Sequence, residues 1–118
     1  MLSNMDNTGI HRKTISQKIR YGGNVVDSVI KVVTEQNYRT GSENIILVKS
    51  VDNCEIILDP TNTNHLIIKS LTNTLLKPSV GEIDEYYNEL LMEKGSCVEL
   101  LFIDSFWYVI SSDGLKFN

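Results

Sequence analysis

The hydrophobic positions of this chain fall into short runs that are typical of β-strands. β-Branched residues dominate the first run, and they pack well on a pleated sheet but lose rotamer freedom in a helix. The later runs are separated by turn formers such as PTNTN at 60–64, and Pro78 ends one of them. The predicted strands are residues 25–33, 44–51, 54–59, 65–71, 72–78, 97–103 and 106–111.

Two of these strands are joined by the turn formers Asp52 and Asn53. The sequence NIILVKSV precedes the turn and CEIILD follows it. Such a short connection between two apolar runs predicts an antiparallel hairpin.

The last two predicted strands carry large apolar side chains at both odd and even positions, in SCVELLFIDSFWYVISS. A sheet with one solvated face would alternate apolar and polar residues instead. We therefore expect other copies of the chain to cover the second face, because soluble monomers rarely expose large apolar patches. The alternative is a compact monomeric sandwich whose second face is filled by the N-terminal arm. The residues assigned to this interface or core are Leu101, Ile103, Phe106, Trp107 and Tyr108.

The segment GEIDEYYNELLMEKG (81–95) fits two structures. Its apolar spacing, with Asp84 as a cap and Gly95 as a stop, would suit a short helix. The regular recurrence of strands favours a loop followed by a strand, which we place at residues 88–93. Tyr86 and Tyr87 in this segment are candidate contacts with a receptor, since tyrosine is enriched at interfaces.

The N-terminal part differs from the rest in charge. Residues 1–40 carry six basic and three acidic side chains, whereas residues 41–118 carry five basic and twelve acidic ones. We expect residues 1–40 to form an arm and docking segment, extended or partly helical in its first 24 residues, and residues 41–118 to form a β-rich domain. An acidic domain should repel nucleic acid, and a basic arm suits an acidic partner surface. The candidate docking residues are Arg12, Lys13, Lys18 and Arg20.

The composition is that of one folded domain: 118 residues, 42% of them hydrophobic and 22% charged. No apolar stretch is long enough to span a membrane, and we expect no secretory signal because residues 1–13 contain no apolar run. Cys54 and Cys97 have no ligand spacing for zinc, and we expect them to be buried free thiols, without metal or cofactor. No catalytic motif is present, so we expect no enzymatic activity. The alternative is a hydrolase that uses the acidic residues Glu82, Asp84 and Glu85.

Several short motifs occur over roughly residues 54–118: Asp59, Thr61, 65–69 (HLIIK), 71–73 (LTN), 83–85 (IDE), 95–99 (GSCVE), 107–110 (WYVI) and 111–115 (SSDGL). Together they resemble the motifs of small trimeric fibre or decoration proteins of large tailed phages and other large double-stranded DNA viruses. One departure concerns the turn before the tryptophan, which commonly carries a glycine in such proteins and here reads Ser105-Phe106.

The resemblance implies a virion structural protein, assembled in the host cytoplasm. It would be a homotrimeric head fibre or capsid decoration, with its arm docked on the major capsid protein or another virion protein. The expected fold is all-β, with antiparallel hairpins in a small sandwich or an intertwined trimeric β-structure. The alternative function is a tail-fibre-type module that binds a receptor or a host surface glycan.

Overall fold

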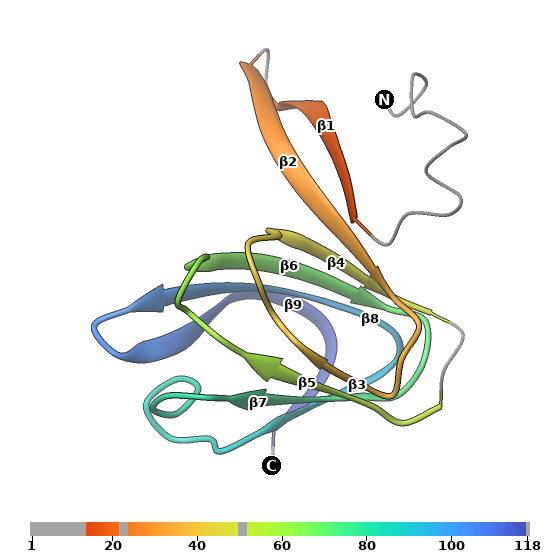
Figure 1. The fold of residues 1–118 in the computed structure, drawn as a ribbon. Coiled ribbons are helices and arrows are strands. Elements are labelled where there is room, and N and C mark those ends of the chain that lie inside the picture. Colours follow the sequence, from red (N-terminus) through yellow and green to blue (C-terminus); the bar gives the residue numbers. More distant parts are fainter. Residues whose placement is uncertain (1–13, 22–23, 50–51, 118) are drawn as a thin grey trace.

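The chain forms one nearly closed β-sheet with a two-stranded ribbon attached to it (Figure 1). The computed structural model describes residues 14–21, 24–49 and 52–117. These residues contain no helix, so the prediction of an all-β fold is confirmed for them, and none of their elements is a helix that could span a membrane. The described strands are β1 (Thr14–Tyr21), β2 (Asn24–Val33), β3 (Asn37–Arg39), β4 (Ile45–Val48), β5 (Cys54–Leu58), β6 (His65–Ser70), β7 (Thr74–Pro78), β8 (Leu90–Ile103) and β9 (Phe106–Phe117).

The strands of the body wind in a spiral, which we call the coil, and successive strands lie in its opposite halves. Strands β2, β4 and β6 pair in parallel in one half, and β3, β5 and β7 pair in parallel in the other. A parallel pair needs a long crossover, and here the intervening strand of the opposite half supplies it. The predicted hairpin of residues 44–51 and 54–59 is therefore wrong, because β5 pairs with β3 and β7 and not with β4.

Strand β8 joins the two halves. Its residues Leu90–Met92 pair with β7, and its residues Cys97–Leu101 pair with β6. An irregular segment between Met92 and Cys97, which includes Gly95 at a φ of 90°, separates the two pairings. The resulting strand order is β1-β2-β4-β6-β8-β7-β5-β3, with β9 antiparallel to β8. The sheet is thus mixed, and antiparallel hairpins make up only part of it.

Segment 81–95 is a turn followed by a strand. Asp84 and Glu85 have left-handed φ angles of 53° and 59°, which a right-handed helix excludes. The strand predicted at 88–93 begins at Leu90 and continues into the strand predicted at 97–103.

The core lies inside the coil. Inward positions alternate with partly exposed ones, as in β5, where Cys54, Ile56 and Leu58 are buried. The curvature of the sheet thus covers one face of strands β4 to β8 without a second copy. The buried apolar residues are Val33, Ile46, Val48, Cys54, Ile56, Leu58, Leu66, Ile68, Leu76, Ile83, Leu90, Met92, Val98, Leu100 and Trp107.

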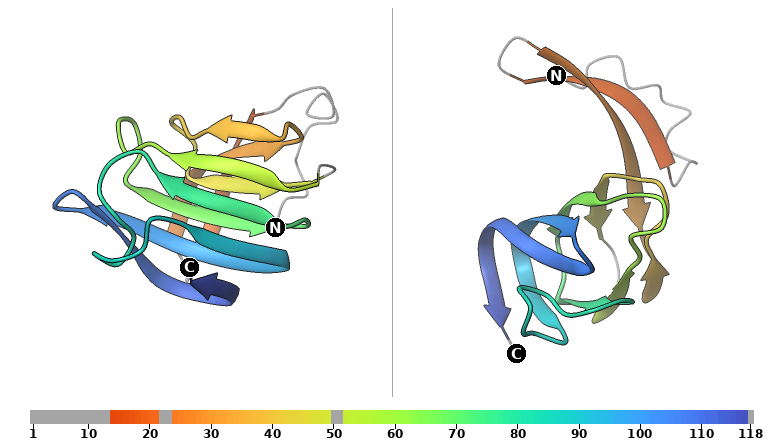
Figure 2. Two further views of the ribbon diagram at one scale, coloured as in Figure 1. Left: turned by 90° about the horizontal axis from the view of Figure 1, so that it is seen from below. Right: turned by 90° about the vertical axis from the view of Figure 1, so that its left-hand side faces the viewer.

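The ribbon consists of β1 and the first part of β2, which pair antiparallel from Tyr21↔Asn24 to Thr14↔Lys31. Within the described part of the chain, its base alone pairs with the body, where Ile30–Val33 pair with β4. The rest of the ribbon stands away from the coil (Figures 1 and 2). Residues 14–21 of the predicted arm are therefore a strand, and its helical alternative does not apply to them.

Candidate interaction surface

Two loops meet at the end of the body that lies away from the ribbon. One is the β7–β8 loop (residues 79–89), and the other is the β8–β9 turn at Asp104-Ser105 (Figures 1 and 2). A Cβ atom built on Gly81 would lie only 2.1 Å from the carbonyl oxygen of Ser105. The loops are therefore in backbone contact, and a glycine is required at this position.

The β8–β9 turn has the geometry that the strand twist demands. Asp104 and Ser105 have φ angles of 50° and 76°, and they connect the paired residues Ile103 and Phe106. Positive φ at both central residues matches a type I′ turn, which usually contains Gly or Asn. Ser105 thus adopts the conformation that a glycine would have favoured at the turn before Trp107.

Hydrogen bonds fasten the β7–β8 loop to the outer edge of β9. The amide of Trp107 donates to the carbonyl of Glu82, and the amide of Asp84 donates to the carbonyl of Trp107, at 3.3 and 2.8 Å. The Asp84 carboxylate accepts from the amide of Val109 at 3.0 Å. Ile83, fully buried, closes a tight turn with Tyr87. The loop is thus a fixed part of the sheet edge.

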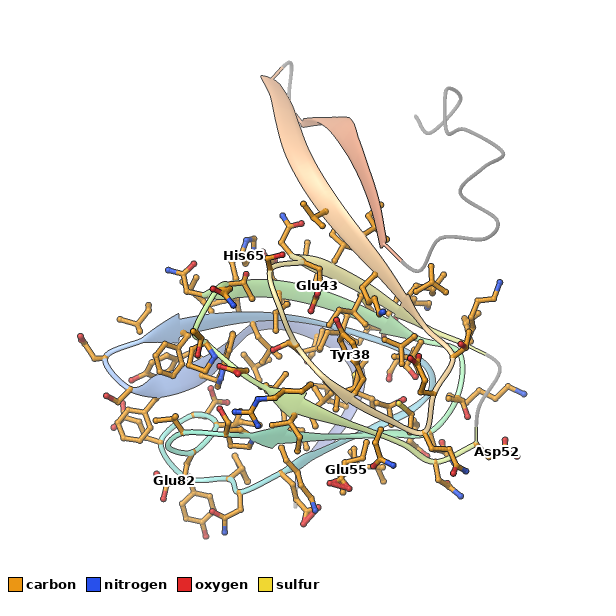
Figure 3. The ribbon with its side chains drawn as sticks, viewed as in Figure 1. Tyr38, Glu43, Asp52, Glu55, His65 and Glu82 are labelled. Carbon is orange, nitrogen blue, oxygen red and sulfur yellow. The ribbon has the colours of Figure 1, made fainter. Side chains whose placement is uncertain are left out.

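The surface formed by the two loops is apolar with acidic neighbours, and we call it the end platform. Tyr86 is 76% exposed, Val80 48% and Ile103 46%, while Phe106 is half-buried. Figure 3 places Glu82 at this end, away from the ribbon. Glu85 accepts a hydrogen bond from the Tyr108 hydroxyl at 2.8 Å, which raises the pKa of Tyr108. The end platform is defined as Val80, Glu82, Glu85, Tyr86, Ile103 and Phe106.

The residues that were predicted as interface or core differ in burial. Trp107 is fully buried beside Phe102, with ring centroids 5.2 Å apart, so it belongs to the core. Leu101, Phe106 and Tyr108 are half-buried and Ile103 is exposed. The outward face of the hairpin is therefore the part that is open to a partner.

The two tyrosines predicted as receptor contacts have different environments. Their rings meet edge to face with centroids 4.9 Å apart. Tyr87 packs against the core, whereas Tyr86 points outward. The sequence analysis did not identify Val80 and Gly81 as part of this surface. The glycine itself, between Val80 and the acidic run EIDE, was the one feature of the sequence that could have indicated a tight turn there.

The predicted docking residues do not come together in one described site. Lys18 and Arg20 belong to β1 of the ribbon, and Arg12 and Lys13 lie outside the described residues. The acidic residues Glu82, Asp84 and Glu85 serve the loop, in which Asp84 and Glu85 accept hydrogen bonds from β9. The carboxylates of Asp84 and Glu85 therefore hold the loop against β9.

The arrangement that most resembles a catalytic site is a row on the outer face of β6, β8 and β9. His65 Nε2 lies 2.6 Å from Glu99 Oε2, and the Ser111 hydroxyl donates to Glu99 Oε1 at 3.3 Å. An open hollow of about 250 Å³ borders this row, lined by Ile67, Cys97, Val98, Glu99, Ser111, Ser112 and Asp113. A nucleophilic triad needs the hydroxyl beside the imidazole. Here the carboxylate lies between them, so the row does not activate Ser111.

A polar cluster lies below the base of the ribbon (Figure 3). The Glu43 carboxylate, 4% exposed, accepts from the Tyr38 hydroxyl at 2.9 Å and from the Gly41 amide at 2.7 Å. Burial and the Glu43 hydrogen bond raise the pKa of Tyr38. The Lys31 ammonium lies 4.9 Å from the centroid of the Tyr38 ring. These contacts hold the β3–β4 connection in place. The hydrogen bonds from Tyr38 and Gly41 satisfy the buried Glu43 carboxylate.

The two cysteines are free thiols in strands, as predicted, but only Cys54 is buried. Cys54 is buried in β5, where its thiol donates to the Glu35 carbonyl at 3.4 Å, and Cys97 is half-buried in β8. Across the described residues, no group of three or more His, Cys, Asp or Glu side chains is placed to hold a metal ion.

Comparison with protein-family models, with curated proteins and with solved structures finds no match for this chain.

Proposed function

We propose that this chain is a structural protein of a virion, a non-enzymatic homotrimeric head fibre or capsid decoration. In this proposal the basic N-terminal arm attaches the protein to an acidic surface of the major capsid protein or another virion protein. Copies of the chain associate through the outward face of the C-terminal hairpin, where Leu101, Ile103, Phe106 and Tyr108 lie.

One observation carries this proposal: the nearly closed β body has a ribbon projecting at one end (Figure 1), and the end platform, with exposed apolar side chains, lies at the other. A protein with two separated surfaces can bind a neighbour at each of them, as a component of a larger assembly must. The sequence motifs of residues 54–118 add the virion context. The Ser111–Glu99–His65 row supports a non-enzymatic role, because its order does not suit nucleophilic catalysis.

Attachment is tested by adding the purified chain to particles that lack it and measuring the bound fraction by co-sedimentation. The charge variant Arg12→Glu/Lys13→Glu should reduce binding, and binding of the native chain should weaken as salt rises, since exposed charges are screened. The matched control is Lys49→Glu, an exposed lysine after β4 in the body. Equal binding of all three chains would contradict the arm as the anchor.

A glycan-binding module is the second candidate function, and the exposure of Tyr86 favours it. An exposed aromatic ring can stack on the apolar face of a sugar. A glycan array with the native chain and Tyr86→Ala tests this function. Leu71→Ala is the control, because Leu71 is 45% exposed and lies at the β6–β7 turn, outside the end platform. Binding that survives Tyr86→Ala, or no binding at all, would eliminate it.

A further inference from the structure

We propose that the end platform of one copy binds the β1–β2 ribbon of a second copy, so that copies assemble head to tail. This inference rests on the self-association in the proposed function and names the two surfaces that meet. It assigns the ribbon to the contact between copies and leaves attachment to a virion partner to Arg12 and Lys13 of the arm. Four observations lead to it.

The chemistry of the end platform is that of an interface. Val80 and Tyr86 on one loop and Ile103 beside the other are each exposed large apolar residues, and the two loops are in backbone contact at Gly81 and Ser105. Glu82 and Glu85 accompany them, and the neighbouring turn adds Asp104. An apolar centre with a charged rim is the usual anatomy of a protein–protein contact, and tyrosine and phenylalanine are enriched there. The acidic rim selects a partner that is basic as well as apolar.

The end platform is also held in place before any partner arrives. Asp84, Glu85, Asp104 and Ser105 all have positive φ, and Gly81 lies in backbone contact with Ser105. Unusual backbone conformations persist only where the surroundings fix them, and they concentrate at functional sites. The hydrogen bonds from the β7–β8 loop to Trp107 and Val109 do this fixing. A preorganised surface loses little conformational entropy on binding.

Among the described residues, the ribbon pairs with the body only at its base. Its register sets Ile15 opposite Ile30 and Ile19 opposite Val26, which are apolar pairs. Beyond Ile30–Val33, the described body forms no strand pairing with it, and it stands clear in both views (Figures 1 and 2). An isolated two-stranded hairpin is at best marginally stable in water. A partner surface would supply the missing stabilisation.

Charge identifies a second copy as that partner. Residues 14–33 contain three basic side chains (Lys18, Arg20, Lys31) and one acidic one, whereas residues 79–89 contain four acidic and no basic ones. Within one chain the ribbon and Glu82 lie at opposite ends of the molecule (Figure 3). The contact must therefore form between copies. It joins two different surfaces, so it closes into a ring or grows into a filament, and a homotrimer would be a ring of three.

The test is sedimentation velocity of the purified full chain at micromolar concentrations, with variants of each surface. The ribbon variant is Lys18→Glu/Arg20→Glu, and the platform variant is Tyr86→Ala/Ile103→Glu. The matched control is Leu71→Glu, because Leu71 is 45% exposed and lies at the β6–β7 turn. Thermal unfolding of each variant by circular dichroism verifies that it is folded.

The native chain and Leu71→Glu should form the same oligomer, and each surface variant should associate at least about tenfold more weakly. An equimolar mixture of the two surface variants should form a 1:1 dimer, since one brings an intact platform and the other an intact ribbon. A ribbon variant that still forms the native oligomer would overturn the head-to-tail contact while leaving self-association in place. A monomeric native chain would overturn both.

Discussion

Gly81 and Ser105 belong to different loops, yet their backbones touch: a Cβ on Gly81 would lie 2.1 Å from the Ser105 carbonyl oxygen. Gly81 also has a φ of +68°, which favours glycine. This single contact sets the β7–β8 loop against the β8–β9 turn. The shape of the end platform therefore depends on it.

Replacing Gly81 by alanine should lower the free energy of unfolding and displace the β7–β8 loop. Gly95→Ala is the matched control, because Gly95 has a φ of +90° but a Cβ there would have no atom within 4 Å. The control should lose about 1–2 kcal/mol from backbone strain, whereas Gly81→Ala should lose more because a backbone atom must also move. Urea denaturation measures both changes. Equal losses would show that the contact with Ser105 is not rigid.

Trp107→Ala should destabilise the protein by about 3–5 kcal/mol, because a fully buried indole leaves a large cavity. Trp107→Phe should cost less. It keeps an aromatic ring beside Phe102, and it removes the indole Nε1, a buried polar atom that has no hydrogen-bond partner among the described residues. Denaturant unfolding followed by far-ultraviolet circular dichroism compares the two variants. A Trp107→Phe loss as large as that of alanine would contradict this explanation.

Acid should remove the contribution of the Asp59 carboxylate to the free energy of unfolding. Hydrogen bonds from the Thr61 hydroxyl and amide, and from Arg39 Nε, lower the pKa of Asp59 to about 2. A carboxylate with a depressed pKa stabilises the folded state above its ordinary pKa of about 3.9. That stability is lost as the pH falls through about 2. Unfolding free energies between pH 5 and 2 should therefore decline less steeply for Asp59→Asn than for the native chain, and parallel curves would refute the effect.

The two thiols should react at different rates. Burial, with the nearby Glu35 and Glu55 charges, raises the pKa of Cys54 to about 11, so its reactive thiolate is scarce at neutral pH. Cys97 is half-buried in β8 and more accessible. Alkylation of the folded chain with iodoacetamide at pH 8, followed by peptide mass spectrometry, should modify Cys97 first. Cys54→Ser should leave this fast reaction unchanged, and rapid labelling of Cys54 would contradict its burial.

The sequence by itself determined where most strands lie. β-Branched runs and turn formers are local properties, and they placed β2, β5, β6 and β7 close to their observed bounds, whereas β9 continues to Phe117, beyond the predicted end at residue 111. The short strand β3 was missed, because Asn37–Arg39 has no apolar alternation. The strand β1 was read as an extended or partly helical arm, because its isoleucines are sparse.

Only the tertiary structure decided which strands pair and which side chains face out. The turn formers at 52–53 suggested a hairpin, but hydrogen bonds from distant strands placed β4 and β5 in opposite halves of the coil. Tyr86 and Tyr87 are adjacent and chemically identical, yet one is exposed and the other packs on the core. Their difference arises from the left-handed turn at Asp84 and Glu85 and from the β9 edge that fixes it. Pairing and exposure depend on contacts between residues far apart in the chain, and local pattern carries no information about those contacts.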